Sequence, residues 1–130
     1  MMTLQSVKIS KEVSVEETLP ADILYQRSIS QLVLDWTKDL VTILQGDYDR
    51  QYGGYPNRYQ FAIKTGRKYY KIHDGNGVHA FIDKKTGQVY KPASWKQPAP
   101  YARYDLRILV DRARCYNNAD WAGGYLYIRG

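Results

Sequence analysis

The chain has 130 residues, which is enough for one ordinary domain and too few for two. With 44% hydrophobic and 25% charged residues it has the composition of a soluble protein that buries one modest core. No apolar run approaches the roughly 18 residues of a membrane span, and the N-terminus lacks the apolar region of a secretory signal. We therefore expect no membrane partner. The single cysteine, Cys115, excludes an intrachain disulfide, so we expect it to be a free buried thiol.

The net charge of +6 is concentrated in the C-terminal part of the chain. Residues 1–50 hold five Lys and Arg against eight Asp and Glu, whereas residues 51–130 hold fourteen against five. Twelve of the thirteen tyrosines also follow residue 47. Such a portion is typical of a surface that contacts phosphates and stacks bases. The same residues also suit solvated turns and amphipathic strands, and this alternative stays open.

The N-terminal half is expected to be mainly helical. Residues 1–17 alternate partly between apolar and polar side chains, which suggests an extended arm. Thr18-Leu19-Pro20 is a helix-entry signal, and Gly46 is expected to end the helix. Apolar and small side chains recur at every fourth position, at Leu24, Ser28, Leu32, Trp36 and Leu40. The apolar surface is wide enough to contact the sheet plus another element or a second copy, so we expect a homo-oligomer.

The middle of the chain is expected to form a β-meander. A tyrosine- and glycine-rich loop, 47–58, precedes a strand at Tyr59–Lys64. Two further strands, 68–73 and 78–83, flank the turn Asp74-Gly75-Asn76-Gly77, and residues 88–91 form a return strand. Three prolines between residues 92 and 100 predict a stiff crossover in which Trp95 packs as an anchor.

The C-terminal part is expected to add one helix and one strand. The helix spans Asp105 to Cys115, with Leu106, Leu109 and Val110 on its apolar side, and the strand spans residues 121–128. The predicted fold is therefore α+β, with an antiparallel β-meander sheet packed against a long N-terminal helix and a second shorter helix. We treat residues 1–130 as a single domain.

Neither metal nor catalytic chemistry is the favoured interpretation. An even-length turn puts His73 and His79 on opposite sides of the hairpin, with Ile72 sharing a face with His79 and Phe81, so we predict no metal site and no cofactor. The letters Asp83-Lys84-Lys85 resemble the D-x-K element of PD-(D/E)xK nucleases, with Asp74 as an upstream Mg²⁺ ligand. The same letters also suit a tight turn closed by Gly87, which we favour.

Two stretches resemble proteins of a particular source. Residues 78–96, from Val78-His79-Ala80-Phe81 to Ser94-Trp95-Lys96, and residues 121–127 are similar to small proteins of marine bacteriophages, cyanophages especially, that have no assigned activity. The resemblance covers roughly residues 66–130. It implies a phage gene product located in the cytoplasm of an infected bacterial host or in the virion, and it carries over no catalytic residue.

The leading hypothesis is a non-enzymatic protein whose basic, tyrosine-rich sheet face binds nucleic acid or a nucleoprotein. The candidate phosphate contacts are Lys64, Arg67, Lys68, Lys71, Lys84, Lys85 and Lys91, and the candidate stacking residues are Tyr52, Tyr55, Tyr69 and Tyr70. The alternative is a structural or protein-interaction module that self-associates through its broad apolar helix. A metal-dependent nuclease is a third interpretation, and it requires Asp74 and Asp83 to converge on one metal ion.

Overall fold

The computed structural model describes residues 20–53 and 59–127. The predicted extended arm, residues 1–17, lies outside them. One long helix, α2 (Ala21–Tyr52), precedes the strands β1 (Ala62–Thr65), β2 (Tyr69–His73), β3 (Val78–Asp83), β4 (Gln88–Tyr90) and β5 (Tyr104–Asp105). A shorter helix, α3 (Leu109–Asn118), and a 3-10 turn, η2 (Gly124–Tyr127), complete the order. The predicted α+β class is therefore confirmed.

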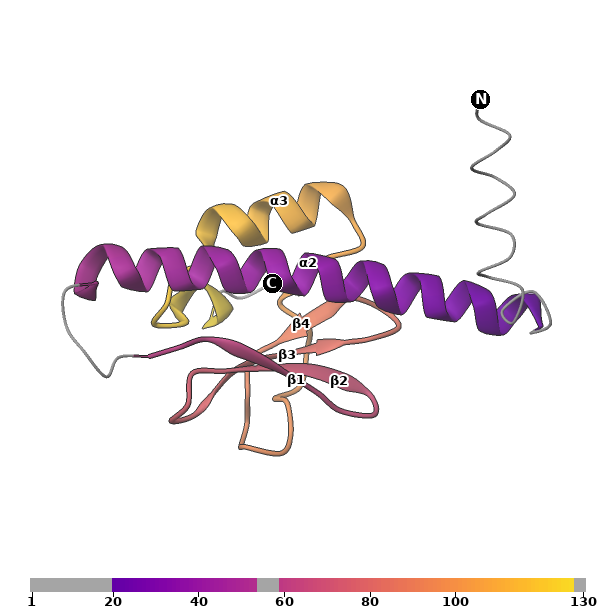
Figure 1. The fold of residues 1–130 in the computed structure, drawn as a ribbon, viewed down its shortest axis with the longest axis horizontal. Coiled ribbons are helices and arrows are strands. Elements are labelled where there is room, and N and C mark those ends of the chain that lie inside the picture. The colour runs from indigo at the N-terminus through magenta and orange to yellow at the C-terminus, as the bar shows by residue number, and fades with distance from the viewer. Residues whose placement is uncertain (1–19, 54–58, 128–130) are drawn as a thin grey trace, which may run out of the picture.

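The five strands form one antiparallel sheet in the order β1-β2-β3-β4-β5, so every strand pairs with its neighbour in the chain. Helix α2 lies across one face of this sheet, and α3 lies beside α2 (Figure 1). The irregular segment that follows β4 hangs below the sheet, on the face opposite α2 (Figure 1). One face of the sheet is thus covered by helix, and the other, which we call the open face, carries only this segment.

The core fills the space between α2 and the sheet. Val33, Leu40 and Leu44 of α2 are fully buried, as are Ile72 and Ile82 of the sheet. Burial of apolar surface at about 25 cal/mol per Å² is the main stabilising term for such a layer. The buried helix stripe is accordingly centred on Leu40, and the predicted stripe is wrong at Leu32, which is 44% exposed.

Helix α2 does not end at Gly46 as predicted but continues to Tyr52. A glycine inside a helix costs about 1 kcal/mol relative to alanine. Contacts just beyond it outweigh that cost, because Asp47 accepts a hydrogen bond from the backbone N–H of Trp121 at 2.9 Å and Tyr48 is buried. Residues 47–52, which we expected in a loop, therefore belong to the helix.

The second surface against α2 is α3. The Tyr116 hydroxyl donates a hydrogen bond to the Trp36 carbonyl at 2.8 Å, and the guanidinium of Arg112 lies 4.2 Å from the centre of the Trp36 ring. Of the two predicted arrangements, the sheet plus another element accounts for this breadth within a single chain. The remaining apolar surface of α2 includes Tyr25, which is 62% exposed.

Helix α3 begins four residues later than predicted. Tyr104 and Asp105 pair with β4 as a fifth strand, and the backbone N–H of Asp105 donates to the carboxylate of Asp111 at 2.6 Å. The expectation that Leu109 and Val110 face the core is wrong, since they are 69% and 77% exposed. Cys115 is a fully buried free thiol, as predicted, and burial raises its pKa to about 12.

The predicted final strand is also wrong over its described part, because Gly124–Tyr127 forms a 3-10 turn. Gly123 has a φ of +86°, which glycine adopts without strain. The carboxylate of Asp120 then accepts the backbone N–H groups of Gly124 at 3.3 Å and of Tyr125 at 3.0 Å. Asp120 thus accepts from backbone N–H groups that, in a strand, would donate to a neighbouring strand.

The β2–β3 hairpin contains a register shift that the sequence did not reveal. Tyr70 pairs with Ile82 and Ile72 with Ala80, but His73 pairs with Val78. His79 is therefore an extra residue without a partner on β2, as in a β-bulge. The prediction that Ile72 shares a face of the sheet with His79 and Phe81 is wrong. Alternation along the strands places Tyr70, Ile72 and Ile82 toward α2, and Tyr69, Lys71 and Phe81 on the open face.

Candidate nucleic-acid interface

Five cationic side chains meet on the open face of the sheet. Together with Tyr69 and Phe81 they line a shallow cavity of about 220 Å³. We call this group the basic face, and its cations are Lys64, Arg67, Lys68, Lys71 and Lys96. Four of them were predicted as phosphate contacts. The first four come from β1, the β1–β2 turn and β2, while Lys96 comes from the segment that crosses the open face.

Two of these lysines face each other directly. Lys64 on β1 is paired in register with Lys71 on β2. Like charges directly opposite on neighbouring strands destabilise a sheet, and a bound anion relieves this repulsion. Part of the cost is offset within the chain, because the Lys71 ammonium lies 4.5 Å from the centre of the Trp95 ring and 5.6 Å from that of Phe81.

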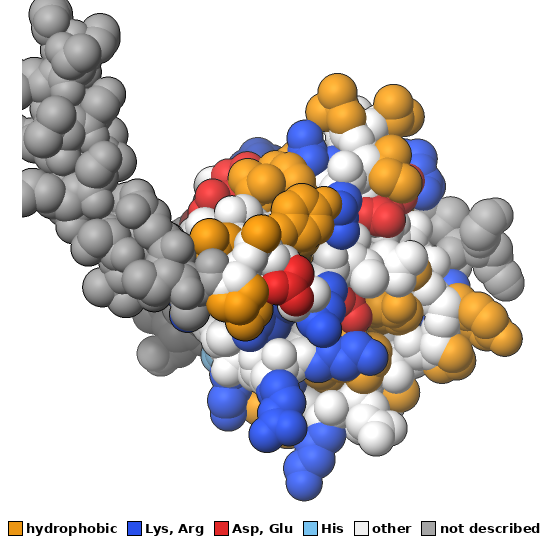
Figure 2. All heavy atoms as spheres, turned by 90° about the vertical axis from the view of Figure 1, so that its right-hand side faces the viewer, with side chains coloured by type: hydrophobic (Ala, Val, Ile, Leu, Met, Phe, Trp, Pro, Cys, Tyr) orange, Lys and Arg blue, Asp and Glu red, His pale blue; other side chains and the backbone are white. Residues whose placement is uncertain are grey.

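The basic face carries uncompensated positive charge. Within residues 20–53 and 59–127, the side-chain ion pairs join Arg50 to Asp47 and Arg114 to Asp111, and neither includes a cation of the basic face. Figure 2 views the end of the molecule that bears the β1–β2 turn. Lys and Arg side chains gather over its lower part, and the visible acidic side chains lie above them. This distribution favours an anionic partner on the open face.

Aromatic rings form the floor of the basic face. Tyr69 packs against Phe81 with ring centres 5.6 Å apart and against Tyr90 at 6.3 Å. The Lys68 ammonium lies 5.4 Å from the centre of the Tyr69 ring. Phe81 is only 2% exposed, whereas Tyr69 is partly exposed. Tyr69 is therefore the predicted stacking residue that the basic face includes.

The other predicted lysines lie apart from this cavity. Lys84 donates a hydrogen bond to the Gly66 carbonyl at 3.1 Å, which ties it to the back of the β1–β2 turn. Lys85 is exposed at the β3–β4 turn, beside Arg107. Lys91 lies beyond β4, with its ammonium 4.7 Å from the centre of the Tyr127 ring. The seven predicted cations thus form one group of four and three separate positions.

The remaining predicted tyrosines are not on the basic face. Tyr70 is 5% exposed, and its hydroxyl donates to the Ser30 carbonyl at 3.0 Å, so its ring has no free face for a base. Tyr52, at the end of α2, packs edge-on against Trp121 with ring centres 5.5 Å apart. Tyr55 lies outside the described residues.

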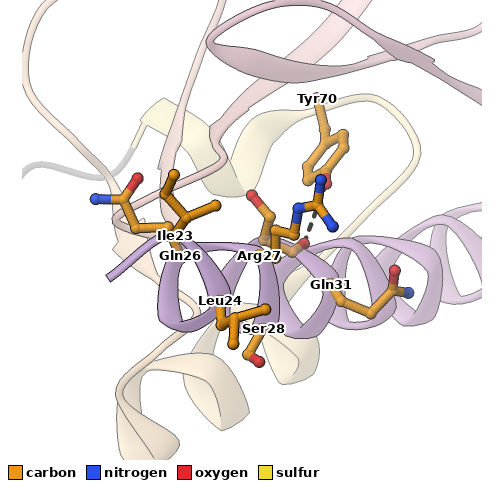
Figure 3. Close-up of a pocket in the computed structure, with 8 residues that line it drawn as sticks. Ile23, Leu24, Gln26, Arg27, Ser28, Gln31 and Tyr70 are labelled. Atoms are coloured by element: carbon orange, nitrogen blue, oxygen red, sulfur yellow. Dashed lines mark hydrogen bonds between the residues drawn. The ribbon is translucent and has the colours of Figure 1, made fainter. Parts of the chain in front are cut away.

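A hollow of about 830 Å³ lies between α2 and Tyr70. Figure 3 shows Arg27 pointing toward Tyr70, whereas Leu24 and Ser28 point away from it. The side chains that border this hollow therefore do not converge on one point. A binding site needs convergent polar groups, so the hollow carries no functional assignment.

The nuclease interpretation fails on geometry. Asp74 lies in the turn before β3 and Asp83 is the last residue of β3, so the strand, about 16 Å long at 3.3 Å per residue, separates them. Asp74 accepts the backbone N–H groups of Asn76 and Gly77 at 2.9 and 2.8 Å, and Asp83 accepts those of Lys85 and Thr86 at 2.8 and 3.0 Å. Each carboxylate thus closes its own turn, and the two cannot share a metal ion.

The rings of the two histidines pack against different partners. His73 lies near Trp95, with ring centres 6.2 Å apart, while His79 packs edge-on against Phe61 at 5.6 Å. Within the part of the chain that the structure describes, no group of three or more His, Cys, Asp or Glu side chains is placed to hold a metal ion.

Sequence reasoning missed Lys96 on the basic face and the exposed position of Trp95 beside it. Lys96 and Trp95 were assigned to a stiff crossover, and Trp95 to a packed anchor, yet its ring is 46% exposed. Residues 91–99 form a closed loop, because the Ala99 N–H donates to the Lys91 carbonyl at 2.8 Å. That closure brings Lys96 back to the open face. The two prolines that flank this loop, in Lys91-Pro92 and Gln97-Pro98, are the sequence signal for a turn here. They do not indicate toward which face of the sheet the loop folds.

Comparison with known proteins identifies the chain at family level. A family model described as "Family of unknown function (DUF7717)" matches residues 20–128. No curated protein and no solved structure matches the chain. Among the described residues, no helix is both long and apolar enough to cross a membrane.

Proposed function

The chain belongs to this family of unknown function, and we propose that it binds nucleic acid through the basic face. The observation that carries the proposal is the meeting of five cations, four from the β1–β2 hairpin and one from the 91–99 loop, around one aromatic floor. Backbone phosphates neutralise such clusters by displacing counterions, and partly exposed rings stack on bases. The proposal assigns phosphate contact to Lys64, Arg67, Lys68, Lys71 and Lys96.

Salt-dependent titration tests this proposal. Fluorescence anisotropy of labelled single- and double-stranded DNA at 50 and 200 mM salt should show affinity that falls as salt rises. The double variant Lys64→Ala/Lys68→Ala removes two exposed charges and no hydrogen bond of the described structure. It should weaken binding about tenfold and lower the salt slope for single strands by about 1.4, at roughly 0.7 per lost phosphate contact.

Lys38→Ala is the matched control for these substitutions. Lys38 is an exposed lysine of α2, outside the basic face, and its removal changes the net charge without changing the proposed site. It should leave the salt slope unchanged. If wild type binds neither form of DNA at 50 mM salt, or if Lys38→Ala weakens binding as much as the double variant does, the basic face is not the binding surface.

Self-association is a second candidate, favoured by the start of α3. Ile108, Leu109 and Val110 are consecutive apolar residues that are 54%, 69% and 77% exposed. Contiguous exposed apolar surface marks interaction sites, and the partner proposed for this surface is a second copy of the chain. Sedimentation velocity should show a dimer or larger species that Leu109→Asp/Val110→Asp converts to monomer. A specific contact of this kind should be populated at about 100 µM protein. If wild type is still a monomer at that concentration, this candidate is removed.

The proposed setting follows from the phage resemblance of residues 66–130. We place the protein in the cytoplasm of an infected bacterial host or in the virion. Mass spectrometry of purified virions and of infected-cell lysate distinguishes the two. Absence from both would refute the phage setting without bearing on the basic face.

A further inference from the structure

A second cavity, of about 250 Å³, lies at the end of the sheet where the β2–β3 turn, the start of the 91–99 loop and residues 121–127 meet. We call it the His79 hollow. Its walls include the aromatic side chains Tyr59, Trp121 and Tyr127, and its polar lining residues are Asp74, His79 and Lys91. Aromatic side chains beside a few polar groups are common in the lining of small-molecule sites.

His79 lines this hollow, and one of its ring nitrogens has no hydrogen-bond partner within the described residues. The residue is 7% exposed, and its Nε2 lies 2.8 Å from the Tyr125 hydroxyl. Within the described residues, Nδ1 has no hydrogen-bond partner. The edge of the ring is left uncovered by Gly123, where an added Cβ would lie 3.7 Å from Cε1 and 4.0 Å from Nδ1.

The proton on His79 can be assigned from its partner. Tyr125 is 4% exposed, and Nε2 is the acceptor that the described structure provides for its hydroxyl proton. A buried hydroxyl without an acceptor is costly, so Tyr125 donates and Nε2 accepts. Burial lowers the pKa of His79 to about 4, so the ring is neutral at pH 7 and its single proton resides on Nδ1. The Nδ1–H group of His79 is thus a hydrogen-bond donor available to a ligand in the hollow.

The other two polar groups complement this donor. Lys91 presents an ammonium group at one wall, against the ring of Tyr127, and forms no ion pair within the described residues. Asp74 uses Oδ1 for its turn, which leaves Oδ2 as an acceptor. A nucleotide matches this set: its phosphate suits Lys91, a ring nitrogen or carbonyl suits the His79 N–H, and an exocyclic amino group suits Asp74. The base itself suits the aromatic walls.

Neighbouring residues link the His79 hollow to the basic face. A groove of about 290 Å³ lies along residues 76–78 and 92–95, and it shares Val78 and Pro92 with the His79 hollow. Trp95 lines the other end of this groove, where its ring contacts the Lys71 ammonium of the basic face at 4.5 Å. An extended strand on the basic face can therefore pass the exposed Trp95 ring and reach the hollow.

We infer that the nucleic acid bound by this protein is single-stranded and that the His79 hollow holds one of its nucleotides, unstacked from its neighbours. The inference rests on the proposed function. A base inside a duplex is stacked and paired, so it enters such a hollow only after unpairing, which costs a few kcal/mol. A single strand avoids this cost. The bound nucleotide packs against Trp121, accepts the His79 N–H and places its phosphate at Lys91.

Strand titration with paired variants tests the inference. Lys91→Gln removes the ammonium from the partly exposed wall. His79→Phe/Tyr125→Phe removes the N–H donor together with the hydroxyl that would lose its acceptor, and it keeps two rings. Anisotropy with a labelled mixed-sequence 20-mer should show a loss of about tenfold for the double variant, because the bound nucleotide loses its hydrogen bond to the His79 N–H. Lys91→Gln should lose about threefold, and Lys38→Gln should match wild type. Duplex binding should be weaker than strand binding in wild type and unchanged by either hollow variant.

Free AMP separates the possible sources of the nucleotide. In ¹H–¹⁵N spectra, AMP should shift the Trp121 indole and Gly123 amide resonances, and His79→Phe/Tyr125→Phe should abolish those shifts. If both hollow variants bind the 20-mer like wild type and AMP shifts neither resonance, the inference is overturned while the proposed function stands. If wild type binds no DNA at 50 mM salt, the proposed function and the strand inference both fail. AMP shifts in that case would identify a free mononucleotide as the ligand.

Discussion

Replacing His79 by glutamine should change how the stability of this protein depends on pH. Burial is the main reason that the pKa of His79 falls to about 4, and the charges of Asp120 and Asp74 oppose the shift only partly. An unfolded histidine has a pKa near 6.5. As the pH falls through 6.5, the unfolded chain binds a proton that the folded chain does not bind until about pH 4. Wild type therefore loses stability across this window and loses no more from His79 below it.

The size of this loss follows from the shift. Each pKa unit corresponds to about 1.4 kcal/mol, so the full window from 6.5 to about 4 amounts to about 3 kcal/mol. Between pH 7 and pH 5 the share is about 2 kcal/mol. A typical small domain has a free energy of unfolding of about 5–15 kcal/mol, so the effect is readily measured.

Urea unfolding at pH 7, 6 and 5, followed by tryptophan fluorescence, provides the assay. Wild type should lose about 2 kcal/mol more than His79→Gln between pH 7 and pH 5. His73→Gln removes the other histidine and keeps His79, so it is the control for the loss of an imidazole side chain. The difference between wild type and His79→Gln reports His79. Equal pH dependence in wild type and His79→Gln would refute the assigned burial.

Three further predictions concern packing and the site. Gly87→Ala places a methyl group 2.8 Å from a side-chain carbon of Arg107 at a φ of +76°, so urea unfolding should show a loss of about 2 kcal/mol or more. Gly75→Ala, at a φ of +93° with open space around it, should lose only about 1 kcal/mol, and equal losses would contradict the crowding. Cys115 should not react with a thiol reagent at pH 8 until the protein unfolds; rapid reaction of the native state would contradict its burial. Tyr70→Phe should cost about 1 kcal/mol and leave DNA affinity unchanged, whereas lost affinity would restore Tyr70 as a stacking residue.

The sheet was the most predictable part of the fold. Strands β2 and β3 are marked by β-branched and aromatic residues on both sides of Asp74-Gly75-Asn76-Gly77, and Asp83 and Gly87 close the next turn. These signals are local, because they depend on side chains that bond their own backbone or permit positive φ. The clustering of Lys64, Arg67, Lys68 and Lys71 followed from them, since β1 and β2 are neighbours in the chain.

Contacts between distant segments were not predictable in the same way. Gly46 is a helix terminator by local preference, yet α2 passes through it because Asp47 and Tyr48 contact Trp121 more than seventy residues away. The residues after Trp121 have the composition of a strand, but Asp120 caps a 3-10 turn there. At Gly46 a hydrogen bond between distant segments decided the local structure, whereas at Gly124–Tyr127 the decisive acceptor is a side chain only four to five residues earlier in the chain.

Local patterns in the sequence therefore determined the α+β class, the meander and the β1–β2 half of the basic face. Only the tertiary structure decided which faces are open, because a one-residue bulge at His79 reverses the alternation that sequence parity assumes. That same bulge turns His79 toward Phe61 and Tyr125, and the closed 91–99 loop adds Trp95 and Lys96 to the open face. The physical reason is that burial and hydrogen bonding are satisfied by the whole chain together, while periodicity describes one segment at a time.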